Sequence, residues 1–479
     1  MSINIIPEKL KVGLFGIGLD TYWPQFKGLK ERLEGYQNKL HKKMRRPDVT
    51  VVDAGLVDTP QKARVAAAFF AEEQVEIIFL YISTYALSST VLPVVQKAKV
   101  PVVVLNLQPV ARIDYESFNK IGDRGLMTGE WLAHCQACSA PEIASVFNRA
   151  GIDYHLITGT LEDRDSWSEI NAWMDAAVVA SKMRRNRVGI LGHYYCGMLD
   201  VYSDMTQQSA IFGNHFEILE MCELNECREN VTDRQVRSKL DAFDREFDIV
   251  RECSKRELER AARTACALDE LVRRHELGSL AYYYEGSPGN EYENIVTSVI
   301  AGNTYLTAHG IPVAGECEIK NVQAMKIMDL FNAGGSFSEF YAMDFEDDIV
   351  MLGHDGPAHT AIAEGRVKLV PLPLYHGKPG SGLSIQMTVK NGPVTLLSVI
   401  QDREGKIKFL VAEGESVPGP ILQIGNTNSR YRFPIGAKKF TNDWCKAGPA
   451  HHCAIGVGHL AHKLERLAAL FGIEMIRVC

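Results

Sequence analysis

The chain has 479 residues, of which 46% are hydrophobic and 23% are charged, and its formal net charge at pH 7 is −7. This composition is typical of a globular protein with more than one core. The mild acidity gives no electrostatic reason to expect a nucleic acid or an anionic membrane as a partner. No apolar run approaches the roughly 20 residues that a spanning helix needs, and residues 1–11 lack a signal-peptide pattern, so we expect a cytoplasmic protein.

Eleven cysteines are scattered through this large chain. Their odd number and irregular spacing favour reduced thiols over a disulfide framework. Cys135 and Cys138 have the spacing of a redox or zinc pair, but no second pair follows at zinc-finger spacing. We expect this pair to be structural or incidental.

Apolar runs alternate with amphipathic stretches in the first third of the chain. The runs cover residues 11–18, 49–53, 77–81 and 100–105, and the amphipathic stretches cover residues 60–74 and 86–98. Continuous apolar strands separated by helices predict a parallel, doubly wound sheet that binds ligands at the carboxyl ends of its strands. Gly13, Gly16 and Gly18 miss the spacing of a dinucleotide fingerprint, so we expect no nucleotide cofactor.

Polar residues follow these predicted strands. They are Asp20, Tyr22, residues 83–85, Asn106 and Gln108. Neutral hydrogen-bonding groups at strand ends suit a polyhydroxylated ligand. A solvated loop is the alternative interpretation for each residue taken singly.

The middle of the chain predicts a second α/β domain. A weaker strand-and-helix pattern at residues 150–183 leads to a basic cluster at residues 182–187, where we place a domain boundary. Further strands are expected at residues 188–192, 216–221 and 280–284, and helical stretches at 231–276 and 291–309. This domain is expected to end near residue 325.

In the last part of the chain the pattern changes from alternating strands and helices to short strands. Short strands separated by Gly, Pro and Asn turns predict an antiparallel sheet or barrel, with strands at 367–372, 383–389, 394–399, 407–412 and 421–425. From Ala450 the spacing of Ile455, Leu460 and Leu464 predicts a helix, followed by a strand at 473–478.

The predicted fold class of the whole chain is α/β. It consists of two doubly wound parallel-sheet domains (1–183 and 184–325) and then a β-rich, barrel-like domain (326–479) with a final helix.

The richest set of candidate metal ligands lies between residues 315 and 359. Glu316 follows a glycine, Glu339 lies among aromatic residues, and His354 ends an apolar run. His451 and His452 form a further candidate pair near the end of the chain. Two carboxylates and an imidazole suit a hard or borderline divalent cation and not a thiolate site.

These residues could perform proton transfer if they meet in space. A cation that chelates a hydroxyl and a neighbouring carbonyl acidifies the C–H bond between them, and a nearby carboxylate can then carry the proton. Structural alternatives are a helix-start carboxylate for Glu316, a buried hydrogen bond for Glu339 and a structural histidine for His354. Three other residues are candidates to orient the ligands: His359, His376 and Asp355.

Four motifs occur in a characteristic order. They are Gly-Glu316-x-x-x-Lys, Ser-Phe-Ser-Glu339-x-Tyr341, Asp348-x-Val-x-Leu-Gly-His354 and Ala-Gly-x-Ala-His-His452. Together they resemble the L-arabinose isomerase family, within the L-fucose and L-arabinose isomerase group. The resemblance spans nearly the whole chain, and its specific part is the carboxy-terminal set.

The resemblance implies a metal-dependent aldose–ketose isomerase whose reaction passes through a cis-enediol. It implies a Mn2+ site, with Mg2+ or Co2+ as alternatives, held by Glu316, Glu339, His354 and His452. Glu316 and Glu339 would also be the catalytic acid/base pair. Which carboxylate is the base, and which of His451 and His452 is the ligand, stays open.

The resemblance also implies a homo-oligomer, a trimer or hexamer, with the active site at a subunit junction. Candidate sugar contacts by this resemblance are Leu19, Thr21, Gln108 and His451. Leu19 and Thr21 stand where the family has a glutamine and a leucine, so the sugar preference does not follow from the resemblance.

Three more departures lie near the candidate site: Glu318, Ile319 and Phe340 replace other residues of the family's pattern. L-arabinose, converted to L-ribulose, is the first candidate substrate, and L-fucose, D-arabinose and D-galactose are alternatives. A non-catalytic sugar-binding protein and a metal-dependent hydrolase are the alternatives from other classes.

Overall fold

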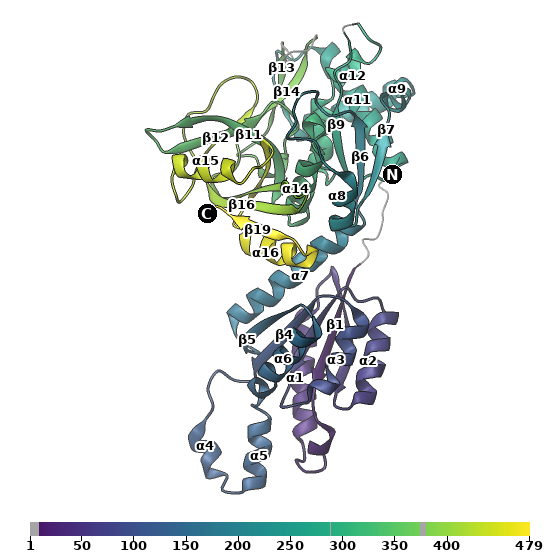
Figure 1. Cartoon of the computed structure of the whole chain (residues 1–479). Coiled ribbons are helices and arrows are strands. Elements are labelled where there is room, and N and C mark those ends of the chain that lie inside the picture. Colours follow the sequence, from purple (N-terminus) through teal and green to yellow (C-terminus); the bar gives the residue numbers. More distant parts are fainter. Residues whose placement is uncertain (1–8, 288, 374–379) are drawn as a thin grey trace. The chain divides into compact units, whose positions relative to one another are not determined.

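A computed structural model describes residues 9–287, 289–373 and 380–479 (Figure 1). The chain divides into two compact units, Met1–Ser181 and Lys182–Cys479. The domain limits expected at residues 183 and 325 remain predictions. No helix within the described ranges has both the length and the apolar character to cross a membrane. The expectation about residues 1–11 falls mainly on residues 1–8, which lie outside the described part.

The first unit is built on a parallel sheet with the strand order β2-β1-β3-β4-β5. Its strands are β1 (Leu10–Ile17), β2 (Val49–Val57), β3 (Ile77–Ile82), β4 (Val102–Gln108) and β5 (Tyr154–Thr160). Every neighbouring pair runs parallel, and the chain reverses its direction of travel across the sheet after β2. The predicted doubly wound sheet is therefore confirmed.

Helices follow the strands of this sheet. They are α1 (Leu29–Met44), α2 (Pro60–Glu72), α3 (Leu92–Ala98), α4 (Tyr115–Lys120), α5 (Arg124–Leu132), α6 (Gln136–Ala150) and α7 (Arg164–Arg184). Local chemistry sets their ends: the Thr59 side chain accepts the N–H of Lys62 at the start of α2, and Gly151 ends α6 with a left-handed φ of 64°. Apolar faces of α2, α3 and α6 cover the sheet.

Several polar residues at the strand ends serve the interior of the first unit. Ser83 and Thr84 are buried and donate hydrogen bonds to the main-chain oxygens of Ile17 and Leu132. Asn106 lies within β4, also buried, and donates to Thr158. These three residues therefore do not lie in open loops, because each is used to satisfy buried polar groups, and their contact with a ligand stays a prediction.

Cys135 and Cys138 form a disulfide at the start of α6, contrary to the expectation of reduced thiols throughout. A spacing of three residues at a helix start brings their Cα atoms to 5.7 Å, which is within disulfide range. The other cysteines that the structure describes are free.

The second unit begins with another parallel sheet, of order β10-β9-β6-β7. Its strands are β6 (Arg187–Gly192), β7 (His215–Leu219), β9 (Ser279–Tyr283) and β10 (Val313–Ala314). The helices of this part are α8 (Met205–Phe212), α9 (Met221–Glu229), α10 (Asp233–Glu246), α11 (Lys255–Arg274), α12 (Glu293–Val296), α13 (Ile300–Ala308) and α14 (Ile319–Leu330). The predicted helical stretch at 231–276 is interrupted by β8 (Asp248–Ile249), and Ser254 caps the helix that follows.

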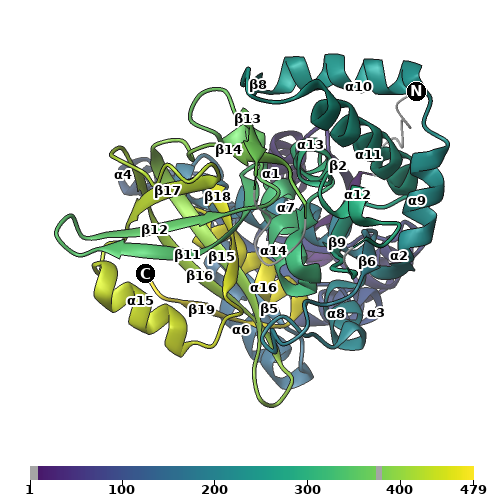
Figure 2. The ribbon, with the colours of Figure 1, turned by 90° about the horizontal axis from the view of Figure 1, so that it is seen from above.

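The rest of the second unit is a closed antiparallel barrel, seen from above in Figure 2. Strands β15 (Gly392–Gln401), β18 (His452–Val457), β11 (Gly334–Asp344), β12 (Ile349–His354), β17 (Thr427–Arg432) and β16 (Ile407–Val417) pair in that order. The pairing of β15 with β16 closes the ring. Helix α16 (Ala461–Phe471) leads to β19 (Glu474–Arg477), which runs parallel to β16. The predicted barrel at the carboxy-terminal end of the chain is confirmed.

Three details of the predicted barrel are wrong. The strand expected at 421–425 is a loop, because the Asn428 side chain bonds both main-chain groups of Leu422, and the strand is β17 instead. Strands β13 (Lys368–Leu372) and β14 (Gly382–Gln386) pair with β8 in a separate sheet. Ile455 lies on β18, not on a helix, since a short fully apolar run cannot be assigned by periodicity alone. Helix α15 (Ala437–Lys446) was not predicted.

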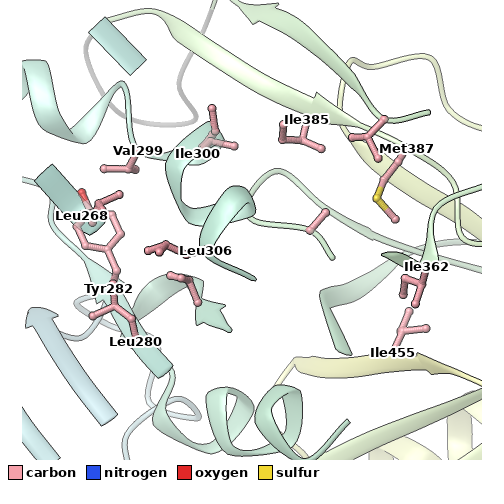
Figure 3. Close-up of a cluster of buried hydrophobic side chains, with 14 of the residues drawn as sticks. Leu268, Leu280, Tyr282, Val299, Ile300, Leu306, Ile362, Ile385, Met387 and Ile455 are labelled. Carbon is pink, nitrogen blue, oxygen red and sulfur yellow. The ribbon is translucent and has the colours of Figure 1, made fainter. Parts of the chain in front are cut away.

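One apolar core joins the helical layer of the second unit to the barrel (Figure 3). Leu268 of α11, Leu280 of β9 and Ile300 of α13 belong to the same cluster as Ile385 of β14 and Ile455 of β18. The strand that begins at His452 is thus fixed by packing on both sides.

A matched pair of substitutions tests the importance of this core. We expect Ile455→Ala, at a side chain that is 0% exposed, to lower the free energy of unfolding by about 2–5 kcal/mol, because it removes transfer energy and leaves a cavity. Ile218→Ala, on the edge strand β7 and 65% exposed, is the control and should change it by less than about 0.5 kcal/mol. Chemical denaturation measures both, and equal losses would contradict the assignment.

Candidate active site

The register of the barrel brings three predicted ligands together. Glu339 on β11 lies directly opposite His452 on β18, and opposite Gly353 on β12. His354 follows Gly353 at the end of β12. One ligand atom from each of Glu339, His354 and His452 lies within 4.8 Å of the others. These candidate ligands therefore come from three adjacent strands, of which β11 and β12 are consecutive and β18 lies far later in the sequence.

Local features of the barrel shape this cluster. A Cβ atom on Gly353 would lie 2.2 Å from the main-chain oxygen of Thr427, so only glycine allows β12 to approach β17 here. The β11–β12 register shifts between Phe340 and Ala342, and such bulges redirect side chains near active sites. The Phe337 ring lies 4.4 Å from that of His354 and 4.3 Å from that of His452, and so provides an apolar wall.

Glu316 reaches the same place from the parallel sheet. It follows β10, in the 3-10 turn η3 (Gly315–Cys317), where both Glu316 and Cys317 have a left-handed φ of 57°. Such a conformation is costly for residues other than glycine, and it recurs at functional sites where the surrounding structure holds it in place. It places Glu316 Oε2 3.3 Å from His451 Nε2 and 3.4 Å from His452 Nε2.

His452 is common to two groups of candidate ligands. One group contains Glu316, His451 and His452, and the other contains Glu339, His354 and His452. The His452 side chain is 0% exposed, whereas that of His451 is 34% exposed. The two histidines are therefore placed differently, one inside the cluster and one at its solvent side.

The donor set fits a divalent cation. Glu316 Oε2 and His452 Nε2 are buried and lie 3.4 Å apart, and neither makes a hydrogen bond within the described part of the chain, although Glu316 Oε2 forms an ion pair with His451 Nε2 at 3.3 Å. A buried polar atom without a hydrogen bond is costly. A cation between the carboxylates and the imidazoles would satisfy both atoms, and such oxygen and nitrogen donors suit Mn2+ or Mg2+.

Glu318 fixes the orientation of His452. Its Oε2 accepts a hydrogen bond of 2.5 Å from His452 Nδ1, and both side chains are buried. With the proton held on Nδ1, the lone pair of Nε2 is free to bind a cation, as in carboxylate–histidine–metal arrangements. In the sequence, Glu318 stood out only as a departure from the family pattern. Its position two residues after Glu316 was the one signal that could have identified it as part of the site.

Asp200 is a second residue that the sequence did not reveal. Its Oδ2 accepts a 2.6 Å hydrogen bond from His451 Nδ1. Burial lowers the pKa of His451, but the carboxylates of Glu316 and Asp200 outweigh burial and raise that pKa to about 9. His451 is therefore held between two carboxylates.

The other predicted site residues are not among the two groups of candidate ligands. Leu19, Thr21 and Gln108 belong to the first unit, at the η1 turn (Asp20–Tyr22) and at the end of β4, and their contact with a sugar remains a prediction. Of the residues expected to orient the ligands, Asp355 accepts from Ser384, and His359 lies 3.5 Å from Asp329. His376 lies outside the described residues.

Known proteins show similarity to this chain in the same region. A family model for the L-arabinose isomerase C-terminal domain matches residues 334–474. The L-arabinose isomerase of Bacillus subtilis (strain 168) is 22% identical over 70% of this chain and 69% of its own length. That of Geobacillus thermodenitrificans is 21% identical over 88% of this chain and 84% of its own length. The resemblance predicted from the motifs is confirmed.

The similarity to one solved structure is too low to indicate a shared fold or function. A solute-binding protein of an ABC transporter from Burkholderia multivorans is 13% identical, covering 58% of this chain and 81% of that chain, with a TM-score of 0.16.

Removal of Glu318 tests its contact with His452. In the metal-free protein, we expect Glu318→Ala to lower the free energy of unfolding by about 1–3 kcal/mol, because the buried Nδ1–H of His452 loses its acceptor. Glu318→Gln retains an acceptor oxygen and should lose less. Glu346→Ala, at an exposed carboxylate beyond β11, is the control for the loss of a charge. Chemical denaturation measures all three, and equal effects of Glu318→Ala and Glu346→Ala would contradict the assigned role.

Proposed function

We propose that this protein is a metal-dependent aldose–ketose isomerase that acts on a free sugar, with L-arabinose to L-ribulose as the first candidate reaction. The matched relatives bear the name of such an enzyme. The observation that carries the proposal is that two groups of candidate ligands share the buried His452: Glu316 with His451, and Glu339 with His354. Sugar-binding alone does not require such a cluster.

In this proposal the cation is held by Glu316, Glu339, His354 and His452. Mn2+ is the first candidate, and Mg2+ or Co2+ are alternatives. A bound divalent ion supplies Lewis acidity, which makes a C–H bond beside a carbonyl easier to deprotonate. Glu318 supports this by keeping His452 Nε2 available.

The carboxylates of Glu316 and Glu339 move the proton between neighbouring carbons of the sugar, through a cis-enediol. They come from different layers of the second unit, η3 and β11, so they approach the cluster from two sides. Because two carboxylates near one site titrate as a coupled pair, the base is assigned to the pair and not to one residue. His451, at the solvent side, binds the sugar.

The proposal includes a cytoplasmic homo-oligomer, a trimer or hexamer, with Leu19, Thr21 and Gln108 contacting the sugar at a subunit junction. This part rests on the resemblance to the isomerase family. A free sugar as substrate agrees with the site itself, where carboxylates and imidazoles offer no cradle for a phosphate.

A sugar panel with a variant control tests the reaction. We expect ketose formation from at least one of L-arabinose, L-fucose, D-arabinose and D-galactose. Glu339→Gln should lower kcat by at least about 100-fold, because an amide cannot carry the proton. Glu346→Gln, at an exposed position outside the site, should retain normal kcat. A Glu339→Gln variant with normal turnover, or a wild-type protein inactive on every sugar, would contradict the proposal.

Removal of the metal tests the cofactor. Exhaustive treatment with a chelator should abolish isomerisation, and Mn2+ should restore it. The ion should also raise the thermal midpoint, since a ligand at 100 times its Kd stabilises the native state by about 2.7 kcal/mol. Full activity after chelation, confirmed by elemental analysis of the treated protein, would exclude a metal-dependent reaction.

A further inference from the structure

Asp200 lies in the loop between β6 and α8. Its Oδ2 accepts two hydrogen bonds from one residue, His451: 2.9 Å from the main-chain N–H and 2.6 Å from ring Nδ1. A side-chain oxygen that binds both the backbone and the ring of one residue fixes the ring relative to its own chain. The two residues are 251 positions apart in sequence.

The contact with Asp200 positions His451, whereas His452 is positioned by the barrel. His452 is the first residue of β18, and its position follows from the ladder of the barrel. His451 lies before that strand and after α15, in a segment without regular hydrogen bonding. Asp200 thus provides for His451 the positional restraint that the β-ladder provides for His452.

The loop that carries Asp200 is itself anchored to the turn that carries Glu316. The buried Lys320 side chain donates to the main-chain oxygen of Asp200. The main-chain N–H of Tyr195, in the same loop, donates to the main-chain oxygen of Glu316 over 3.4 Å. These contacts tie Asp200 to the Glu316 turn, and with the bonds to His451 they keep His451 Nε2 at 3.3 Å from Glu316 Oε2.

We propose that Asp200 is a positioning residue of this active site, which holds the His451 ring so that Nε2 faces Glu316 and the sugar. The effect on turnover rests on the proposed function, whereas the effect on the ring is a property of the folded chain. Asp200 acts through His451, and Glu318 acts through His452. Loss of the Asp200 carboxylate should therefore affect sugar turnover, and loss of the Glu318 carboxylate should affect metal binding.

The experiment compares Asp200→Ala with Asp200→Asn in the full-length protein. We expect Asp200→Ala to lower kcat by about 10- to 100-fold, the range for lost orienting partners, with an unchanged affinity for Mn2+. Asp200→Asn keeps an acceptor oxygen in place and should restore most of kcat. Asp204→Ala is the control: it removes the side-chain cap of α8 in the same loop, and should lower thermal stability without changing kcat.

A double-mutant cycle separates positioning from general damage. In a His451→Ala background, Asp200→Ala should have no further effect on kcat, because contacting residues that act as a unit are not additive. By contrast, Glu318→Ala should weaken Mn2+ binding by about 10- to 100-fold. Additive losses in the cycle, or loss of Mn2+ affinity in Asp200→Ala, would overturn the inference.

The hydrogen bond of the His451 ring can also be measured without any enzymatic activity, so its outcome does not depend on the proposed function. Imidazole 15N–1H spectra of the metal-free protein, labelled at histidine, should show a hydrogen-bonded Nδ1–H for His451, lost in Asp200→Ala and kept in Asp200→Asn. An unchanged His451 signal in Asp200→Ala overturns the inference whatever the activity. If the signal is lost as expected but the wild-type protein isomerises no sugar, the ring-positioning role stands and the proposed function fails.

Discussion

The arrangement of the site depends on the buried hydrogen bond between His452 and Glu318. Both side chains are removed from water, so each needs the other, and their pairing joins β18 of the barrel to the start of α14 after the parallel sheet. The bond fixes the His452 ring in one orientation, with Nε2 toward Glu316. This contact joins candidate ligands of the barrel and of the parallel-sheet layer into one cluster.

The two layers contribute in different ways. The barrel places Glu339 and His354 through strand register, which is set by packing and by a glycine that admits close strand approach. The parallel sheet places Glu316 through a left-handed turn at the carboxyl edge of its strands. The residue that follows the strained turn is fixed, because Glu318 donates its main-chain N–H to the oxygen of Gly315 and binds His452 through its side chain.

Adjacent histidines occupy different environments here. His452 is enclosed by the barrel and held by a buried carboxylate, whereas His451 is half open to solvent and held by the loop residue Asp200. A doublet of this kind can divide two tasks between neighbours, cation binding inside and substrate contact outside. In the proposed isomerase this division would follow from burial, because an ion needs a dry, fixed ligand whereas a sugar enters from solvent.

The sequence alone determined the parallel doubly wound sheet, the barrel-like end of the chain and the candidate ligands Glu316, Glu339, His354 and His452, because apolar runs and motif order are local signals. Only the tertiary structure decided the barrel pairing, the separate sheet of β8, β13 and β14, and the roles of Glu318 and Asp200. The bonds from these two carboxylates to the histidines join residues 134 and 251 positions apart. No spacing rule reaches so far, since such contacts exist only when packing brings separate strands and loops together.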